Sequence, residues 1–76
     1  MKIKAKAAAP HLRAELDNAA GAKLGGQPSE LRHTVYSAFD YANNAVASGW
    51  FGGDNDVYTV EVEVSTKTLN LAITRK

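Results

Sequence analysis

The sequence contains no cysteine, so neither a disulfide nor a thiolate zinc site can stabilise the fold. Two histidines, His11 and His33, are too few to anchor a structural metal by themselves. No stretch is long and apolar enough to span a bilayer. The fold must therefore rest on packing, or on packing helped by a partner subunit, because 76 residues are near the lower limit for a self-sufficient core.

The sequence also lacks an excess of positive or negative charge. Nine Lys and Arg residues against eight Asp and Glu give a formal net charge of +1. A protein that binds the phosphate backbone normally shows a clear basic excess or a basic stripe, so the balance disfavours nucleic acid as a partner. A weak nucleic-acid binder stays open as an alternative, with its candidate contacts at Lys2, Lys4, Lys6, Arg75 and Lys76.

The N-terminus, "MKIKAKAAAP", lacks the uninterrupted apolar segment of a secretory signal, because lysine recurs at every second position. We therefore expect a cytoplasmic protein, and we take the chain, which begins at Met1, as a complete small reading frame. The hydrophobic fraction of 45% is ordinary for a globular protein, which argues against disorder, and a length of 76 residues predicts a single domain over residues 1–76.

Alternating apolar and polar residues predict three strands. The first covers residues 2–7, "KIKAKA", and a C-terminal hairpin joins "VYTVEVEV" (57–64) to "TLNLAITR" (68–75) through a turn at "STK". If the first strand joins this sheet, its lysines share the outer face with Glu61 and Glu63, and pairs of opposite charge help fix the register.

A helix is predicted over residues 29–48, with Ser29 as its cap and Gly49 at its end. Tyr36 and Tyr41 flank its apolar face on either side. That face consists of Leu31, Val35, Ala38, Phe39, Ala42, Ala45 and Val46.

Residues 10–20, "PHLRAELDNAA", fit either a helix that stops at Gly21 or a strand. The helix is favoured, because no β-branched or aromatic residue occurs between Ile3 and Thr34, whereas Ala, Leu, Arg and Glu are good helix formers. Residues 21–28, "GAKLGGQP", read as a linker. The fold class is thus α+β, a small antiparallel-rich sheet with helix 29–48 packed on one face, in the order βααββ, with ββαββ as the alternative.

The stretch "SGWFGGDNDVYTV", residues 48–60, is the most informative part of the chain. Its "GGDND" segment resembles a fragment of a calcium loop. A helix–loop–helix calcium site needs Glu at the twelfth position, however, which counted from Asp54 is Ser65. Tandem calcium repeats need more than the one copy present. We expect a turn here, with no metal and no cofactor.

Trp50 and Phe51 could each serve either packing within the protein or binding of a partner. Trp50 falls at the edge of the apolar stripe and is expected to close the end of the core, whereas Phe51 beside two glycines fits a protein-binding hot spot. Asp54 and Asp56 would suit a basic partner surface. The candidate binding surface is Trp50, Phe51, Asp54 and Asp56, with Tyr36 and Tyr41 second.

Catalysis is not expected. Glu61 and Glu63 share a strand face, but exposed carboxylates beside lysines lack the environment that acid–base catalysis uses. His33 and Asp40 lie two helical turns apart, too far for a direct hydrogen bond. Gly25 and Gly26 lack the Lys-Ser/Thr pair of a phosphate loop.

The hairpin "VYTVEVEVSTKTLNLAITRK", with "VYSAFDYA" in the helix and "KIKAKA" at the start, resembles the immunoglobulin-binding domain of protein L. The resemblance covers about half of the chain. It implies two strands, a helix and two further strands, and binding of antibody light chains through the second strand and the helix.

The leading hypothesis is a non-enzymatic protein-binding module. By analogy of size and character, we expect a phage- or mobile-element-encoded inhibitor of a bacterial macromolecular complex, such as an anti-CRISPR protein. Its partner would then be a host defence complex in the host cytoplasm. A homodimer that completes the small core is a further possibility.

Overall fold

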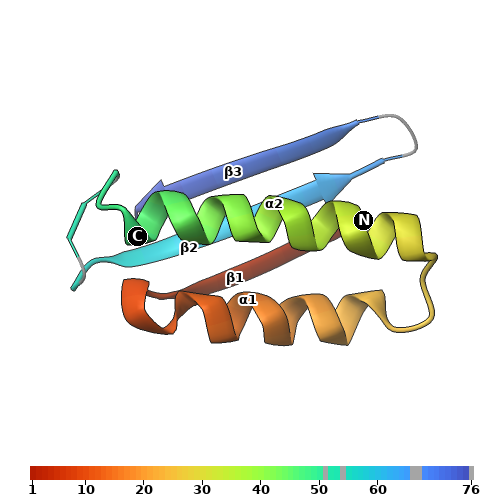
Figure 1. Ribbon diagram of the computed structural model, residues 1–76, viewed down its shortest axis with the longest axis horizontal. Coiled ribbons are helices and arrows are strands. Elements are labelled where there is room, and N and C mark those ends of the chain that lie inside the picture. The colour runs from red at the N-terminus through yellow and green to blue at the C-terminus, as the bar shows by residue number, and fades with distance from the viewer. Residues whose placement is uncertain (51, 54, 66–67, 76) are drawn as a thin grey trace.

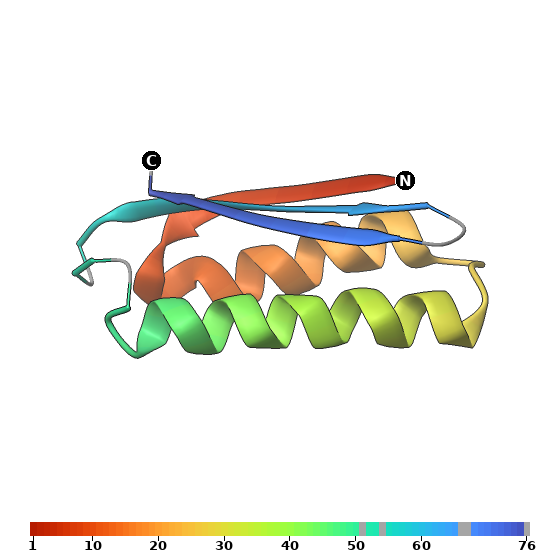
Figure 2. The ribbon, with the colours of Figure 1, turned by 90° about the horizontal axis from the view of Figure 1, so that it is seen from above.

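The computed structural model describes residues 1–50, 52–53, 55–65 and 68–75. The elements follow in the order β1 (Lys2–Ala8), α1 (Ala9–Leu24), α2 (Ser29–Ala47), β2 (Val57–Val64) and β3 (Leu69–Arg75). The strands form an antiparallel sheet in the order β1-β2-β3, and both helices pack on one face of it (Figures 1 and 2). The predicted order βααββ is confirmed, and the ββαββ alternative is wrong, because residues 10–20 are helical.

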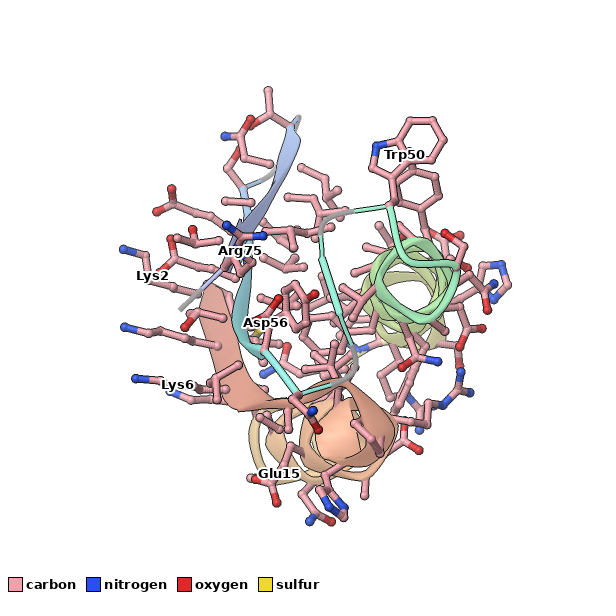
Figure 3. The ribbon with its side chains drawn as sticks, turned by 90° about the vertical axis from the view of Figure 1, so that its left-hand side faces the viewer. Lys2, Lys6, Glu15, Trp50, Asp56 and Arg75 are labelled. Atoms are coloured by element: carbon pink, nitrogen blue, oxygen red, sulfur yellow. The ribbon has the colours of Figure 1, made fainter. Side chains whose placement is uncertain are left out.

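The sheet has one buried and one solvated face, as its alternating sequence predicts. Lys2 lies opposite Glu63 and Lys4 opposite Glu61 in the register of β1 and β2. Lys2 and Lys6 project from the outer face, away from the helices (Figure 3). The Lys2 Nζ atom lies 3.9 Å from Glu61 Oε2, a partly exposed pair that contributes at most a few tenths of a kcal/mol. The inner face of β1 and β2 buries Ile3, Ala5, Tyr58, Val60 and Val62.

Helix α1 is longer than predicted. It continues through Gly21 to Leu24, so the linker begins only at Gly25. Burying a leucine side chain contributes about 1.5–3 kcal/mol, which exceeds the cost of about 1 kcal/mol for glycine within a helix. Leu24 is 1% exposed. The contacts of Leu24 with the core therefore carry the helix past the glycine. The buried residues recur every four positions, at Leu12, Leu16, Ala20 and Leu24.

Helix α2 follows the prediction closely. Its buried residues are Val35, Phe39, Ala42 and Val46. The helix ends at a left-handed Gly49, whose φ is 82° and whose N–H donates to the Val46 carbonyl at 3.1 Å. The predicted cap at Ser29 is wrong: Pro28 occupies the cap position, and the Ser29 hydroxyl accepts a hydrogen bond from Arg32 Nη2 at 3.1 Å.

A charge contact joins the two helices on their solvent side. Arg13 Nη1 lies 2.5 Å from Asp40 Oδ1 of α2, and Arg13 Nε lies 3.5 Å from Asp17 Oδ2 of α1. About half of each side chain is exposed, so the pairs orient the helices more than they stabilise the fold. Within the described residues, no helix is long and apolar enough to cross a membrane.

Candidate functional site

The segment between α2 and β2 is held at both of its ends. At the helix end, the Trp50 N–H donates to the Ala45 carbonyl at 3.3 Å. At the strand end, the Asp56 N–H donates to the Gly53 carbonyl at 3.2 Å, which closes a turn. Both bonds are between backbone groups, so the chain is hydrogen-bonded at Trp50, where it leaves α2, and at Asp56, directly before β2.

Asp56 braces this loop with its side chain. Its Oδ2 atom accepts a hydrogen bond from the Gly53 N–H at 2.9 Å and lies 3.9 Å from Arg75 Nη1 on β3. The Tyr58 hydroxyl donates to the Gly53 carbonyl at 3.1 Å. Because the side chain of Tyr58 is fully buried, the turn is attached directly to the core. We call Gly52, Gly53, Asp56, Tyr58 and Arg75 the loop brace.

Gly52 has no room for a side chain. A Cβ atom at this position would lie 2.5 Å from Asp56 Oδ2 and 2.9 Å from both Tyr58 Oη and Arg75 Nη1. All three atoms belong to the loop brace, so a larger residue would have to displace it. The glycine is required here by close packing, since its φ is not in the left-handed region.

Trp50 stands outside the core, with 80% of its surface exposed. The expectation that it closes the end of the core is wrong. That expectation extended the helical wheel to residue 50, but α2 ends at Ala47 and the left-handed Gly49 turns the chain away from the helix axis. Figure 3, which looks along α2, shows the indole projecting to the side of the helix, on the side of the molecule far from α1.

The other predicted site residues do not form one surface with Trp50. Phe51 and Asp54 lie outside the described residues. Asp56 is half-buried, and its carboxylate is engaged within the loop brace. Tyr36 and Tyr41 are 36% and 67% exposed, but five residues of helix place them about 140° apart around α2.

Tyr36 lies on the α1 side of α2, where it lines a shallow hollow with Leu24, Gly25 and Arg32. Tyr36 therefore does not lie on the face of α2 that is directed toward β3. Among the predicted residues that the structure describes, Trp50 is the most exposed, and its backbone N–H is hydrogen-bonded to Ala45 in the last turn of α2.

A second exposed apolar surface was not predicted. Leu69 of β3 is 37% exposed, and Leu71 and Ile73 are half-buried, although all three lie on the inner face of the sheet. At one end this row joins an open hollow whose apolar lining includes Leu31 and Val64. The available sequence signal was the absence of charge between Leu69 and Thr74, because exposed edge strands usually carry charged residues.

The described residues contain no cluster of three or more histidine or acidic side chains that could hold a metal ion. No protein-family model, curated protein or solved structure matches the chain. A functional proposal must therefore rest on the geometry of its own surface.

Proposed function

We propose that this protein is a small binding module that docks onto a larger protein, with Trp50 as its main anchor. The observation that carries the proposal is the 80% exposure of the single tryptophan on a loop that is tied to a helix end and to the core. Tryptophan is among the residues most enriched at binding hot spots, because its indole buries a large apolar area and also carries a hydrogen-bond donor.

Rigidity of the loop supports an anchor role. Ordering a flexible loop upon association costs free energy, and a loop that is already fixed avoids that cost. Here the Asp56 carboxylate, the Tyr58 hydroxyl and two backbone bonds hold the chain on both sides of Trp50 before any partner arrives. The backbone from which the indole projects is thus hydrogen-bonded before association, which favours binding to a specific pocket on the partner.

For the partner, we propose a bacterial macromolecular complex, such as a defence complex that a phage- or mobile-element-encoded protein would inhibit. The support is the small size of the chain and its nearly neutral charge, at +1, which suits a protein surface better than a nucleic acid. Lys2 and Lys4 of β1 lie opposite Glu63 and Glu61 on β2, so the described outer face of these two strands carries charges of both signs and no uniform basic stripe for phosphates.

Antibody light chain is a less favoured partner. The protein L resemblance assigns light-chain contact to a second strand followed by the helix. Residues 9–24 are helical here, so the contacting strand has no counterpart in this fold.

The test is a quantitative capture experiment from a bacterial lysate that contains CRISPR effector complexes. Immobilised wild-type protein is compared with Trp50→Ala and with a matched control, Tyr36→Ala. The control removes an aromatic residue on the α1 side of α2, whereas Trp50 lies on the side far from α1. Far-UV circular dichroism verifies that both variants are folded. A stoichiometric partner should be retained by Tyr36→Ala and reduced at least about tenfold by Trp50→Ala, since hot-spot truncation costs 2 kcal/mol or more.

Equal capture by the folded Trp50→Ala variant would refute the anchor role. If no effector complex is captured by the wild-type protein, the proposed partner class is wrong.

A further inference from the structure

The two helices cover the sheet unevenly. On the inner face, Ile3 and Ala5 of β1 and Tyr58, Val60 and Val62 of β2 are at most 8% exposed, whereas Leu69 on β3 is 37% exposed and Leu71 and Ile73 are half-buried. Figures 1 and 3 agree on the reason: α1 lies over β1, α2 lies over β2, and β3 extends beyond α2 on its open side. The row Leu69, Leu71 and Ile73 therefore forms an uncovered apolar margin of the core.

The same strand has an open hydrogen-bonding edge. The Ser65 N–H donates to the Thr68 carbonyl at 2.9 Å, so this pair is a hydrogen-bonded pair of the β2–β3 ladder. Such pairs alternate along an antiparallel ladder. In the register of β2 and β3, Asn70, Ala72 and Thr74 then bond to β2, while Leu71 and Ile73 direct their N–H and C=O groups to the free edge.

Charge distinguishes the two edges of the sheet. Edge strand β1 carries Lys2, Lys4 and Lys6 on its outer face. A two-fold antiparallel pairing of β1 with itself that keeps the helices on one side, with its axis anywhere from Lys2 to Lys6, places lysine opposite lysine, which is destabilising. Strand β3 has no charged side chain from Leu69 to Thr74, so its edge lacks this protection.

We propose that β3 pairs antiparallel with β3 of a second copy of this chain, giving a two-fold symmetric dimer. The dimer has one continuous six-stranded sheet with all four helices on the same face. Each copy extends the apolar margin of the other, so the row of Leu69, Leu71 and Ile73 is flanked by the same row of the second copy and loses part of its exposure to water. This inference concerns self-association and does not depend on the proposed docking function of Trp50.

Two requirements set the register of this β3–β3 pairing. Opposite residues must lie on the same face of the sheet, and residues whose N–H and C=O groups face the free edge must lie opposite each other. With the two-fold axis at Ala72, Leu71 of one copy lies opposite Ile73 of the other, and both residues are edge-facing, so they exchange hydrogen bonds. On the outer face, Asn70 then lies opposite Thr74, and Ala72 lies opposite its own symmetry mate. The single charged residue of the strand, Arg75, lies opposite Leu69 rather than another charge. In this register β3 can therefore pair with itself without bringing like charges opposite each other.

The test is the mass of the protein in solution, measured by sedimentation equilibrium from about 1 µM to about 1 mM. The wild-type protein should change with concentration from 8.1 kDa to twice that mass. The variant Ala72→Lys should remain a monomer, because two introduced ammonium groups would face each other across the axis. Within one chain, position 72 lies opposite Glu61, so the same lysine does not impair folding.

Two controls keep the result specific. Ala72→Gln adds a neutral side chain of similar reach and should still form the dimer. Ala72→Glu alone should be a monomer, but an equimolar mixture of Ala72→Lys and Ala72→Glu should restore the dimer, because opposite charges then meet at the axis. Circular dichroism checks that each variant is folded.

Amide hydrogen exchange provides a residue-level measurement. In the wild-type protein, the amides of Leu71 and Ile73 should gain protection as concentration rises, whereas the Ala72 amide, bonded to β2, should be protected throughout. A wild-type protein that stays monomeric over the whole range overturns the proposal. So does a dimer that persists in Ala72→Lys, since its interface must then lie elsewhere.

Discussion

At the scale of single residues, the position of Trp50 depends on contacts made by its neighbours. Gly49 adopts a left-handed conformation that turns the chain out of α2, and Asp56 fixes the returning segment through the Gly53 amide. Both residues influence where the indole stands. In this loop the Asp56 carboxylate has a structural contact, because its Oδ2 atom accepts a hydrogen bond from the Gly53 amide and lies 3.9 Å from Arg75 Nη1.

Gly52→Ala should destabilise the protein by about 1–3 kcal/mol, because the new methyl group would overlap the Asp56 carboxylate and the Tyr58 hydroxyl. Urea unfolding followed by circular dichroism measures the change. The matched control is Gly53→Ala, whose methyl group would meet Asp56 Oδ2 at an ordinary 4.0 Å. Equal stability of the two variants would show that the loop brace is looser than its geometry indicates.

At the scale of elements, α1 contains a glycine that its helix does not need. Gly21 lies inside α1 with nothing within 4 Å of the position of a Cβ atom, and its φ is not in the left-handed region. The conformational freedom of glycine in the unfolded chain therefore costs stability without a packing benefit.

Gly21→Ala should raise the free energy of unfolding by about 0.5–1 kcal/mol. The contrasting variant is Gly49→Ala, which should lower it by roughly 1–2 kcal/mol, because a side chain is strained at a φ of 82°. Both changes can be read from urea midpoints at unchanged m-value. If Gly21→Ala lowers stability, then α1 does not run through residue 21 as a regular helix.

The strands, helix α2 and the pairing of lysines with glutamates could be predicted because each depends on local periodicity. Alternation over residues 2–7 and 57–64 and the apolar stripe of α2 leave few other arrangements. The end of α1 could not be predicted in this way. It depends on the burial of Leu24, a tertiary contact that outweighs the local preference of Gly21 to end a helix.

The site was harder to predict than the fold. Trp50 has the sequence position of a core residue, and only the backbone turn at Gly49 shows that it points into solvent. The uncovered inner face of β3 has an apolar alternation like that of β2. Sequence patterning identifies which side of a strand is apolar, but not whether a helix covers it.

At the scale of the whole molecule, two helices pack on a three-stranded sheet and leave the inner face of β3 only partly covered. In a chain of this size, a subunit that supplies the missing cover adds a large share of the buried apolar area. Self-association along β3 and docking through Trp50 are separate proposals, and the variants Ala72→Lys and Trp50→Ala test them separately.

Docking through Trp50 requires an indole that is in water before the partner arrives, and the fluorescence of the single tryptophan reports this directly. The wild-type protein should show the emission of a fully hydrated indole and be quenched by acrylamide almost as readily as N-acetyltryptophanamide. Its anisotropy should decay with the tumbling of the whole protein, because the loop is braced. Blue-shifted emission that resists acrylamide would place Trp50 in the core and contradict its role as an anchor.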